Sequence, residues 1–314
     1  MKQVYVAGHA GLIGSALVRR LSRAGVHVLT RSRAALDLTD GTAVAAFFEA
    51  YRPDHVVLAA GRVGGIVENL SCPADFIREN LAIQLNVLQA AHETGVRKLI
   101  FFGSSCMYPR EAAQPMAETA LLTGAPEPTS LAYAVAKLAG LQMCLAYTQQ
   151  FGEQRFIPVI PNSVFGPNDH FDPRRGHVLS ALIRRFHEAV STGADEITLW
   201  GSGAPRREFL HADDLAHACF ALLTEETDGL TLPLNIGGGA DISIRELATM
   251  IADIAGFSGR ILWDTTKPDG APRKLLDSTR MRDFGWRPVV DLASGLRATY
   301  RWYAENKVFQ EQPA

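Results

Sequence analysis

Tyr133 and Lys137 are the two residues of this chain whose types and spacing point most directly to chemistry. They lie four positions apart in the run Ser130-Leu-Ala-Tyr-Ala-Val-Ala-Lys137, so a helix would present both side chains on one face. A free tyrosine titrates at about pH 10, and a neighbouring ammonium favours its phenolate. We therefore expect Lys137 to lower the pKa of Tyr133 toward neutrality and to make it a proton donor. A purely structural amphipathic helix is the alternative.

Three further features favour the chemical interpretation. A glycine-rich turn begins at Gly8, the polar run Ser104-Ser105-Cys106 ends an apolar stretch, and His177 follows downstream. Hydroxyl, thiol and imidazole groups are the side chains that general acid–base chemistry uses.

Alternating apolar runs and helical patterns must position these residues. Buried parallel strands are predicted near residues 2–7, 26–30, 54–60, 97–103 and 155–162. Helices are predicted near residues 12–24, 41–51, 75–94 and 132–151. This alternation predicts an α/β fold with a doubly wound parallel sheet of the Rossmann type, whose ligand crevice lies at the carboxyl ends of the strands.

The character of the sequence changes after about residue 165, where Gly, Pro and Arg residues introduce shorter elements. We expect residues 1–165 to form the dinucleotide-binding domain. Residues 166–314 are predicted to form mainly a smaller substrate-binding lobe, with some segments returning to the first domain.

The glycine turn follows the first predicted strand and opens the first predicted helix. Such a turn lets the backbone approach a pyrophosphate, and the helix N-terminus favours its charge. A glycine turn that serves only packing is the alternative. The predicted cofactor contacts in this segment are Gly8, Gly11, Leu12, Ile13 and Gly14.

The end of the second strand indicates which dinucleotide binds. An NAD site usually places an acidic residue there, whereas this chain has Arg31 and Arg33, which suit a 2'-phosphate. NADP is therefore the predicted cofactor, although both arginines in a solvated loop would be the structural alternative. Asp37 and Leu38 are spaced to contact an adenine edge, but a helix-capping role for Asp37 or Asp40 is equally compatible with the sequence.

Composition excludes several other classes of function. The 314 residues are 47% hydrophobic and 20% charged with a net charge of −2, so we expect no nucleic-acid partner. The four cysteines lack metal-ligand spacing and are too few for a disulfide scaffold, so no metal site and a reducing cytoplasm are predicted. No apolar run reaches the roughly 18 residues of a membrane helix, and we expect no membrane association.

The order of these motifs resembles the extended short-chain dehydrogenase/reductase family. Within it, further segments resemble the GDP-L-fucose synthase branch over nearly the full length: Val63-Gly-Gly-Ile66, Pro73-Ala-Asp-Phe76, Gly103-Ser-Ser-Cys-Met-Tyr-Pro109, Gln114-Pro-Met-Ala-Glu118, Trp200-Gly-Ser-Gly203, Arg207-Glu-Phe-Leu-His211 and Lys267-Pro-Asp-Gly-Ala-Pro-Arg-Lys-Leu-Leu-Asp277. The resemblance implies that GDP-4-keto-6-deoxy-D-mannose is epimerised at C3 and C5 and then reduced at C4 with NADPH.

The resemblance also implies a role for each chemical residue. Cys106 and His177 would be the acid/base pair of epimerisation, because inverting a carbon beside a ketone needs one group to remove a proton and another to return it. Ser104 would hydrogen-bond the C4 oxygen, Tyr133 would protonate it, and Lys137 would hold the nicotinamide ribose. A small buried hydrophobe at Cys106 and a helix-start residue at His177 are the alternatives.

Binding contacts follow from the same resemblance. Cofactor contacts are implied at Ala60, Asn162, Val164 and His177, besides Tyr133 and Lys137, and GDP-sugar contacts at Arg185, Trp200, Arg207 and Lys274. The structural alternatives are that the arginines are merely exposed to solvent and that the tryptophan merely packs in the core. The chain departs from the family pattern in two places: Ala10 replaces a common arginine, and Leu131-Ala132 replaces an expected Glu-Pro.

Some questions stay open at this point. A relative acting on another GDP-4-keto sugar or GDP-heptose would use the same residues, and an inactive NADP-binding regulator is a candidate from another class. The helices over residues 78–94 and 133–151 are expected to pair with their counterparts in a homodimer through a four-helix interface, as in relatives, with a monomer as the alternative.

Overall fold

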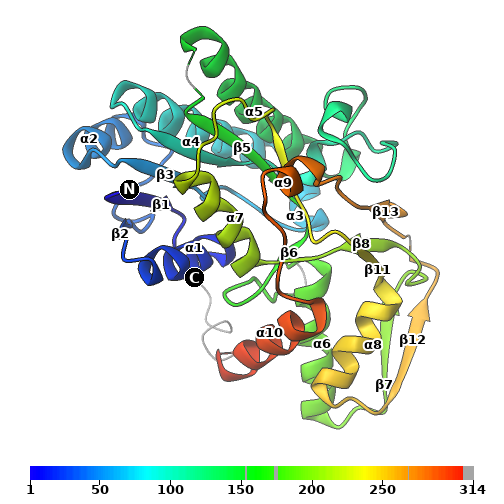
Figure 1. Ribbon diagram of the computed structural model, residues 1–314. Helices are drawn as coiled ribbons and strands as arrows, with labels where there is room; N and C mark the ends of the chain where they lie inside the picture. The colour runs from blue at the N-terminus through cyan, green and yellow to red at the C-terminus, as the bar shows by residue number, and fades with distance from the viewer. Residues whose placement is uncertain (153, 173–175, 268, 307–314) are drawn as a thin grey trace.

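A six-stranded parallel sheet forms the centre of the computed structural model, which describes residues 1–152, 154–172, 176–267 and 269–306. The strand order is β10-β5-β4-β3-β1-β2, and every neighbouring pair is parallel. The strands are β1 (Gln3–Ala7), β2 (His27–Leu29), β3 (His55–Leu58), β4 (Lys98–Phe102), β5 (Phe156–Pro161) and β10 (Leu234–Ile236). This is the predicted doubly wound sheet (Figure 1).

Helices cover both faces of the central sheet, and each face has its own apolar cluster (Figure 1). One face carries α2 (Gly41–Tyr51), α4 (Pro73–Glu93) and α5 (Leu131–Phe151). The other face carries α1 (Leu12–Arg23) and α7 (Ala212–Thr224). Strands buried on both faces explain why their sequences read as continuous apolar runs.

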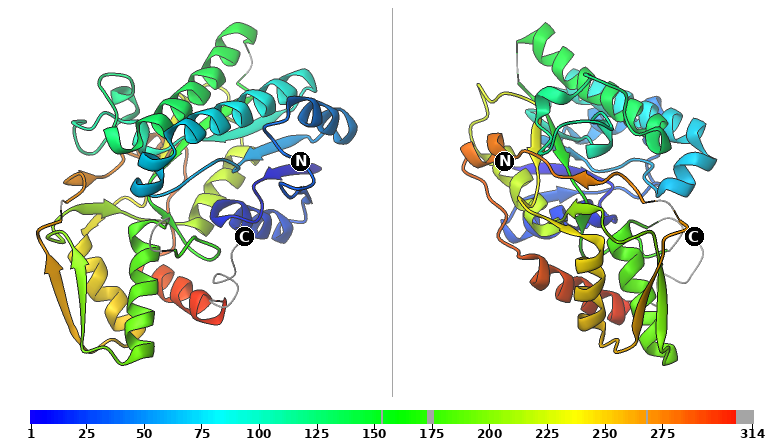
Figure 2. Two further views of the ribbon diagram at one scale, coloured as in Figure 1. Left: turned by 180° about the vertical axis from the view of Figure 1, so that it is seen from behind. Right: turned by 90° about the vertical axis from the view of Figure 1, so that its right-hand side faces the viewer.

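The remaining elements form a second lobe, which lies below the central sheet in both views of Figure 2. A third apolar cluster holds this lobe together. Its helices are α6 (Val178–Thr192), α8 (Ile244–Ala255) and α10 (Leu292–Asn306). Its strands are β7 (Glu196–Trp200) with β12 (Arg260–Asp264), and β8 (Arg206–Glu208) between β11 (Asp241–Ser243) and β13 (Arg273–Lys274).

The chain crosses between the two regions more than once. Strand β6 (Val164–Phe165) pairs with β9 (Leu210–His211), after which α7 packs on the central sheet and β10 joins its edge. The short helix α9 (Thr279–Asp283) also packs near β10. A domain boundary at residue 165 stays a prediction. That prediction allowed some segments after residue 165 to return to the first domain, and α7 and β10 are segments of this kind.

The predicted strands and helices of the first half agree with the observed ones to within a few residues. The sequence analysis did not identify the short elements α3 (Ile66–Ser71), η1 (Ser105–Met107), η2 (Glu118–Ala120) and η3 (Pro128–Ser130). These elements of one or two turns carry too few residues for a hydrophobic period to be visible.

Helix α5 corrects the expectation that no apolar run reaches the length of a membrane helix. Together with the preceding turn it spans Pro128–Phe151, which is long and apolar enough to cross a membrane by length and composition alone, with a mean hydropathy of 1.2. A core helix passes the same test, and 44% of its apolar window is buried inside the protein. Its packing against α4 and β5 accounts for the apolar sequence.

Candidate active site

The glycine turn after β1 requires glycine at two positions. Gly8 has a φ of +81°, in the left-handed region that side chains disfavour. A Cβ on Gly14 would lie 2.1 Å from the carbonyl oxygen of Gly8, so only glycine lets the first turn of α1 approach the strand this closely. Gly11 caps α1, and among the described residues no side chain occupies the cap. The N–H groups of Leu12 and Ile13 are therefore placed where a helix N-terminus binds a phosphate.

The two arginines after β2 have different surroundings. Arg31 packs its guanidinium over the rings of Tyr51 at 4.5 Å and Phe47 at 5.5 Å, measured to the ring centres. The side chain of Arg33 is 74% exposed, and its ion pairs with described residues are long, at 3.8 Å to Asp37 and 3.7 Å to Glu79. Arg33 is thus the more available cation for a 2'-phosphate, while Arg31 is partly committed to packing.

The structure separates the alternatives that the sequence left for the adenine segment. Asp40, and not Asp37, caps α2, because its carboxylate accepts the N–H of Ala43 at 3.1 Å. Asp37 accepts both the N–H and the hydroxyl of Thr39, and these hydrogen bonds hold its pKa below the usual range. The side chain of Leu38 is buried in the core, so it offers a ligand mainly its backbone.

Serine, cysteine and tyrosine meet at the carboxyl end of β4. Ser104 caps the 3-10 turn η1, and its hydroxyl oxygen accepts the N–H of Cys106 at 3.3 Å. Tyr133, on the first turn of α5, shares a side-chain hydrogen bond with Ser104 and interacts electrostatically with Cys106. The predicted Ser104, Cys106 and Tyr133 are therefore brought together, although they come from two elements.

Lys137 completes this group. Its Nζ lies 5.9 Å from the centre of the Tyr133 ring and 5.1 Å from that of Phe101. A Cβ on Gly61 would lie 3.7 Å from the same Nζ, which places the ammonium beside the loop that contains Ala60. The lysine thus faces the predicted cofactor side of the site.

The pKa of Tyr133 differs from the expectation. Burial raises the pKa of Tyr133 above its ordinary value, the nearby Cys106 adds to the rise, and the hydrogen bond from Ser104 opposes it. Burial also lowers the pKa of Lys137 to about 8. Desolvation disfavours both charged forms, so for Tyr133 it acts in the opposite direction to the effect that the sequence argument expected from the ammonium.

A small pocket opens beside the cysteine. Its volume is about 10 Å³, and Cys106, Gln114, Arg273 and Lys274 belong to its wall. The predicted acid/base thiol and the predicted substrate lysine therefore face one cavity, although 168 positions separate them in the sequence.

A buried network beneath this pocket escaped the sequence analysis. The Ser105 hydroxyl donates to Asn162 Oδ1 at 2.9 Å, and Asn162 Nδ2 donates to Glu208 Oε2 at 3.1 Å and to the Lys274 carbonyl at 3.2 Å. Glu208 is fully buried and also accepts the N–H groups of Gly239 and Leu276. Asn162, predicted as a cofactor contact, has its side chain engaged in joining the two lobes, and Val164 follows it on β6.

His177 is the N-cap of α6 and is exposed. His177 interacts electrostatically with the buried Asp169, whose pKa is raised by burial, and Ser180 donates a hydrogen bond to the same carboxylate. The distance between His177 and Cys106 is not fixed by these contacts, so their pairing stays a prediction.

The predicted substrate residues lie on the second lobe. Arg185 of α6 donates to the Thr198 carbonyl of β7, and burial lowers the pKa values of both Arg185 and Arg207. Trp200, at the end of β7, is 69% exposed, with Lys267 Nζ 5.7 Å from its ring centre. A core role for Trp200 is excluded by this exposure. A larger cavity of about 330 Å³ has Arg207 in its wall but neither Cys106 nor Tyr133.

Comparison with known proteins gives consistent matches. The model of the NAD dependent epimerase/dehydratase family matches residues 4–237. GDP-L-fucose synthase 1 of Arabidopsis thaliana is 51% identical over 305 residues, which cover 97% of this chain and 94% of that protein.

Two solved structures resemble the whole chain. A GDP-L-fucose synthetase from Naegleria fowleri bound to NADP has a TM-score of 0.89 and 27% identity, covering 99% of this chain and 96% of that one. A GDP-6-OMe-4-keto-L-xylo-heptose reductase from Campylobacter jejuni has a TM-score of 0.90 and 34% identity, covering 97% and 98%.

Proposed function

This chain belongs to the NAD dependent epimerase/dehydratase family, and we propose that within it the protein converts GDP-4-keto-6-deoxy-D-mannose to GDP-L-fucose with NADPH. The observation that carries the proposal is the meeting of Ser104, Cys106 and Tyr133 at the end of β4, with Lys137 on the cofactor side. The 51% identity to a GDP-L-fucose synthase supports the choice of substrate.

The glycine turn fits an NADP cofactor on the structure's own geometry. The close approach of Gly14 to Gly8 holds the start of α1 against the end of β1 with no side chain at either glycine, and Arg33 is exposed after β2. When bound, NADPH supplies the hydride that reduces the C4 ketone. Lys137 would hold the nicotinamide ribose beside Gly61.

The chemistry begins with two inversions. The protons at C3 and C5 flank the C4 ketone and are acidic because the resulting enolate is delocalised. Cys106 removes a proton, and His177 returns one on the opposite face. Ser104 hydrogen-bonds the C4 oxygen during both stages, which stabilises the charge that develops there.

Reduction follows inversion. As the C4 carbon receives a hydride, the oxygen gains negative charge, and Tyr133 donates its proton to it. The raised pKa of Tyr133 keeps the hydroxyl protonated until that oxygen becomes basic. Arg185, Arg207 and Lys274 bind the diphosphate, and the exposed Trp200 stacks on the guanine or ribose.

Assembly and location complete the proposal. Helices α4 and α5 lie side by side on one face and expose Leu85, Val135 and Phe151, at 53%, 41% and 46%. Two copies would bury these side chains in a four-helix homodimer interface. Light scattering at micromolar concentration distinguishes this dimer from a monomer. We place the enzyme in the cytoplasm, where its four cysteines would remain reduced.

One assay tests the function. Purified protein is incubated with NADPH and GDP-4-keto-6-deoxy-D-mannose, and NMR gives the configuration of the product. GDP-L-fucose is the expected product, whereas a GDP-6-deoxy-D-hexose as product would contradict the proposed epimerase activity. A GDP-4-keto-heptose is tested in parallel, because the similarity to the heptose reductase supports it as the second candidate substrate. Faster turnover of the heptose would overturn the fucose assignment.

A further inference from the structure

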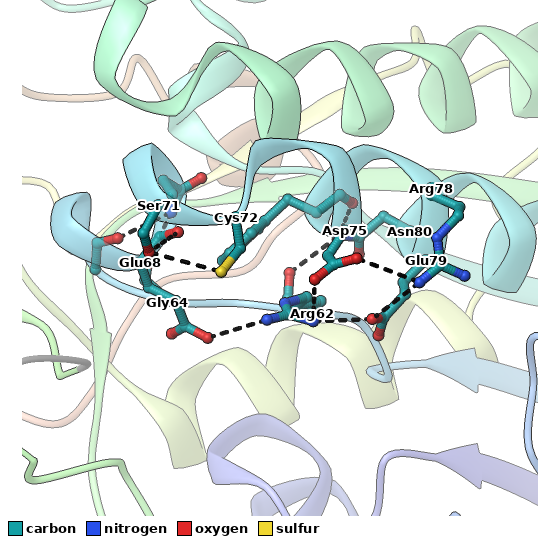
Figure 3. Close-up of polar contacts among 12 residues, drawn as sticks. Arg62, Gly64, Glu68, Ser71, Cys72, Asp75, Arg78, Glu79 and Asn80 are labelled. Carbon is teal, nitrogen blue, oxygen red and sulfur yellow. Dashed lines mark hydrogen bonds and ion pairs between the residues drawn. The ribbon is translucent and has the colours of Figure 1, made fainter.

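A cluster of ion pairs surrounds the loop that follows β3. The guanidinium of Arg62 contacts three carboxylates, with distances of 2.9 Å to Glu79, 3.5 Å to Asp75 and 3.6 Å to Glu68. Figure 3 shows Asp75 and Glu79 pointing from helix α4 toward Arg62, and Glu79 also contacts Arg78. We call these five residues the Arg62 cluster.

Glu79 also has a contact outside this cluster. Its Oε2 lies 3.7 Å from Nη2 of Arg33, the exposed arginine after β2. Glu79 belongs to α4, which follows β3, and β1 lies between β2 and β3 in the sheet. The contact therefore joins the segment after β2 to a helix that follows β3, and these two strands flank β1, which carries the glycine turn.

Arg33 is the partner that moves more readily. The Glu79 side chain is 11% exposed and is fixed by its 2.9 Å contact with Arg62, whereas the Arg33 side chain is 74% exposed. A phosphate arriving at the end of β2 would draw the flexible guanidinium away from the carboxylate. One guanidinium fork cannot serve both acids fully, because each prefers a bidentate contact.

We propose that Glu79 is a specificity-determining residue that acts through Arg33, competing with the 2'-phosphate of NADP for its guanidinium. Ligands with a 2'-phosphate must break the Arg33–Glu79 pair, whereas ligands without it leave the pair in place. Glu79 thus reduces the preference for NADP over NAD. The inference rests on the proposed role of Arg33 in cofactor binding.

The test uses two small probes that differ only in the phosphate, 2',5'-ADP and 5'-AMP, with binding measured by calorimetry. Glu79→Gln keeps the side-chain shape and removes the charge. We expect this variant to bind 2',5'-ADP about two- to fivefold more tightly, the usual range for a partly exposed ion pair, and 5'-AMP as the wild type does. Unchanged or weaker binding of 2',5'-ADP overturns the inference.

Asp75→Asn is the matched control. Asp75 lies on the same helix and contacts the same Arg62, but within the described part of the chain its ion pairs do not include Arg33. This variant should leave both affinities unchanged. An equal gain in both variants would show a general charge effect and would overturn a specific role for Glu79.

A double-mutant cycle tests whether the effect passes through Arg33. In an Arg33→Ala background, Glu79→Gln should no longer change the affinity for 2',5'-ADP. A persistent gain overturns the mechanism. If the wild type binds 2',5'-ADP no more tightly than 5'-AMP, the inference and the Arg33 assignment fail together, while sugar turnover with NADPH tests the proposed function separately.

Discussion

The Lys137 ammonium lies 5.9 Å from the centre of the Tyr133 ring, and burial shifts the pKa values of these two residues in opposite directions. The tyrosine pKa rises and the lysine pKa falls to about 8, so the protein moves both groups toward their neutral forms. A neutral phenol is the form that donates a proton, which suits Tyr133 to reduction.

Tyr133→Phe removes that proton donor and should lower hydride transfer by roughly 100-fold or more. The absorbance of NADPH at saturating keto sugar gives the rate. Tyr147→Phe is the control, since this tyrosine lies on the same helix and its hydroxyl contacts Gln89. Near-normal NADPH oxidation by Tyr133→Phe would remove the assignment.

Lys137→Met should be more stable than the wild type at pH 7, by about 1–3 kcal/mol, because it no longer buries an ammonium. The pKa of Lys137 falls from 10.5 to about 8 on folding, so the unfolded chain binds the proton more tightly between these values. The contribution of Lys137 to the free energy of unfolding of the wild type therefore rises as the pH rises from about 8 to 10.5.

Thermal unfolding across this range checks the sign. The difference between Lys137→Met and the wild type should be largest at pH 7 and should shrink as the pH rises past 8. A wild type that is more stable than the variant at pH 7 would show that the ammonium contributes favourable contacts instead. Loss of activity in the stabilised variant would be a trade-off between stability and function.

Replacing Arg31 and Arg33 together with alanine should weaken NADPH binding by about tenfold or more and NADH binding far less, because only the former loses a phosphate partner. Fluorescence titration measures both cofactors. The single variants divide the effect: Arg33→Ala should account for most of it, since Arg31 is stacked on Tyr51. Equal losses for both cofactors would show that the arginines form a solvated loop.

Cys106→Ser should lose most exchange of the sugar C3 and C5 protons with solvent, because a hydroxyl has a far higher pKa than a thiol and is a poor base. The wild type in deuterated water should incorporate deuterium at both carbons, as read by NMR. Cys72→Ser is the control, since Cys72 lies at the C-terminus of α3. A wild-type product without deuterium would make the protein a plain 4-keto reductase.

His177→Asn should behave differently from Cys106→Ser. Cys106 can still remove a proton in its deprotonated form, so some exchange remains, but return on the opposite face is lost and inversion stays incomplete. NMR of the recovered keto sugar separates exchange from inversion. Complete inversion in His177→Asn would assign the second proton transfer to another group.

Five strands of the central sheet were predictable because their signals are local, whereas β10, which joins from the second half of the chain, was not predicted. Continuous apolar runs mark strands buried on both faces, and the glycines from Gly8 to Gly14 mark the turn that only glycine allows. The contacts that arrange the site could not be predicted, because they join segments that are distant in the sequence. Ser105, Asn162 and Glu208 form hydrogen bonds across the two lobes, and Arg33 pairs with Glu79. The pKa of Tyr133 was missed because depth of burial cannot be inferred from a spacing of four residues.

Strand β10 comes from the second half of the chain but pairs with β5 at the edge of the central sheet, and this limits which chimeras with a relative can fold. A chimera that exchanges everything after residue 165 would also replace β10 and α7, so the central sheet would depend on a foreign edge strand and a foreign layer of its core. Glu208 would meet Asn162 from a different parent, and any mismatch would leave a buried carboxylate without its donors. The predicted nucleotide contacts at Trp200, Arg207 and Lys274 are therefore better transplanted as single side chains than as a whole lobe.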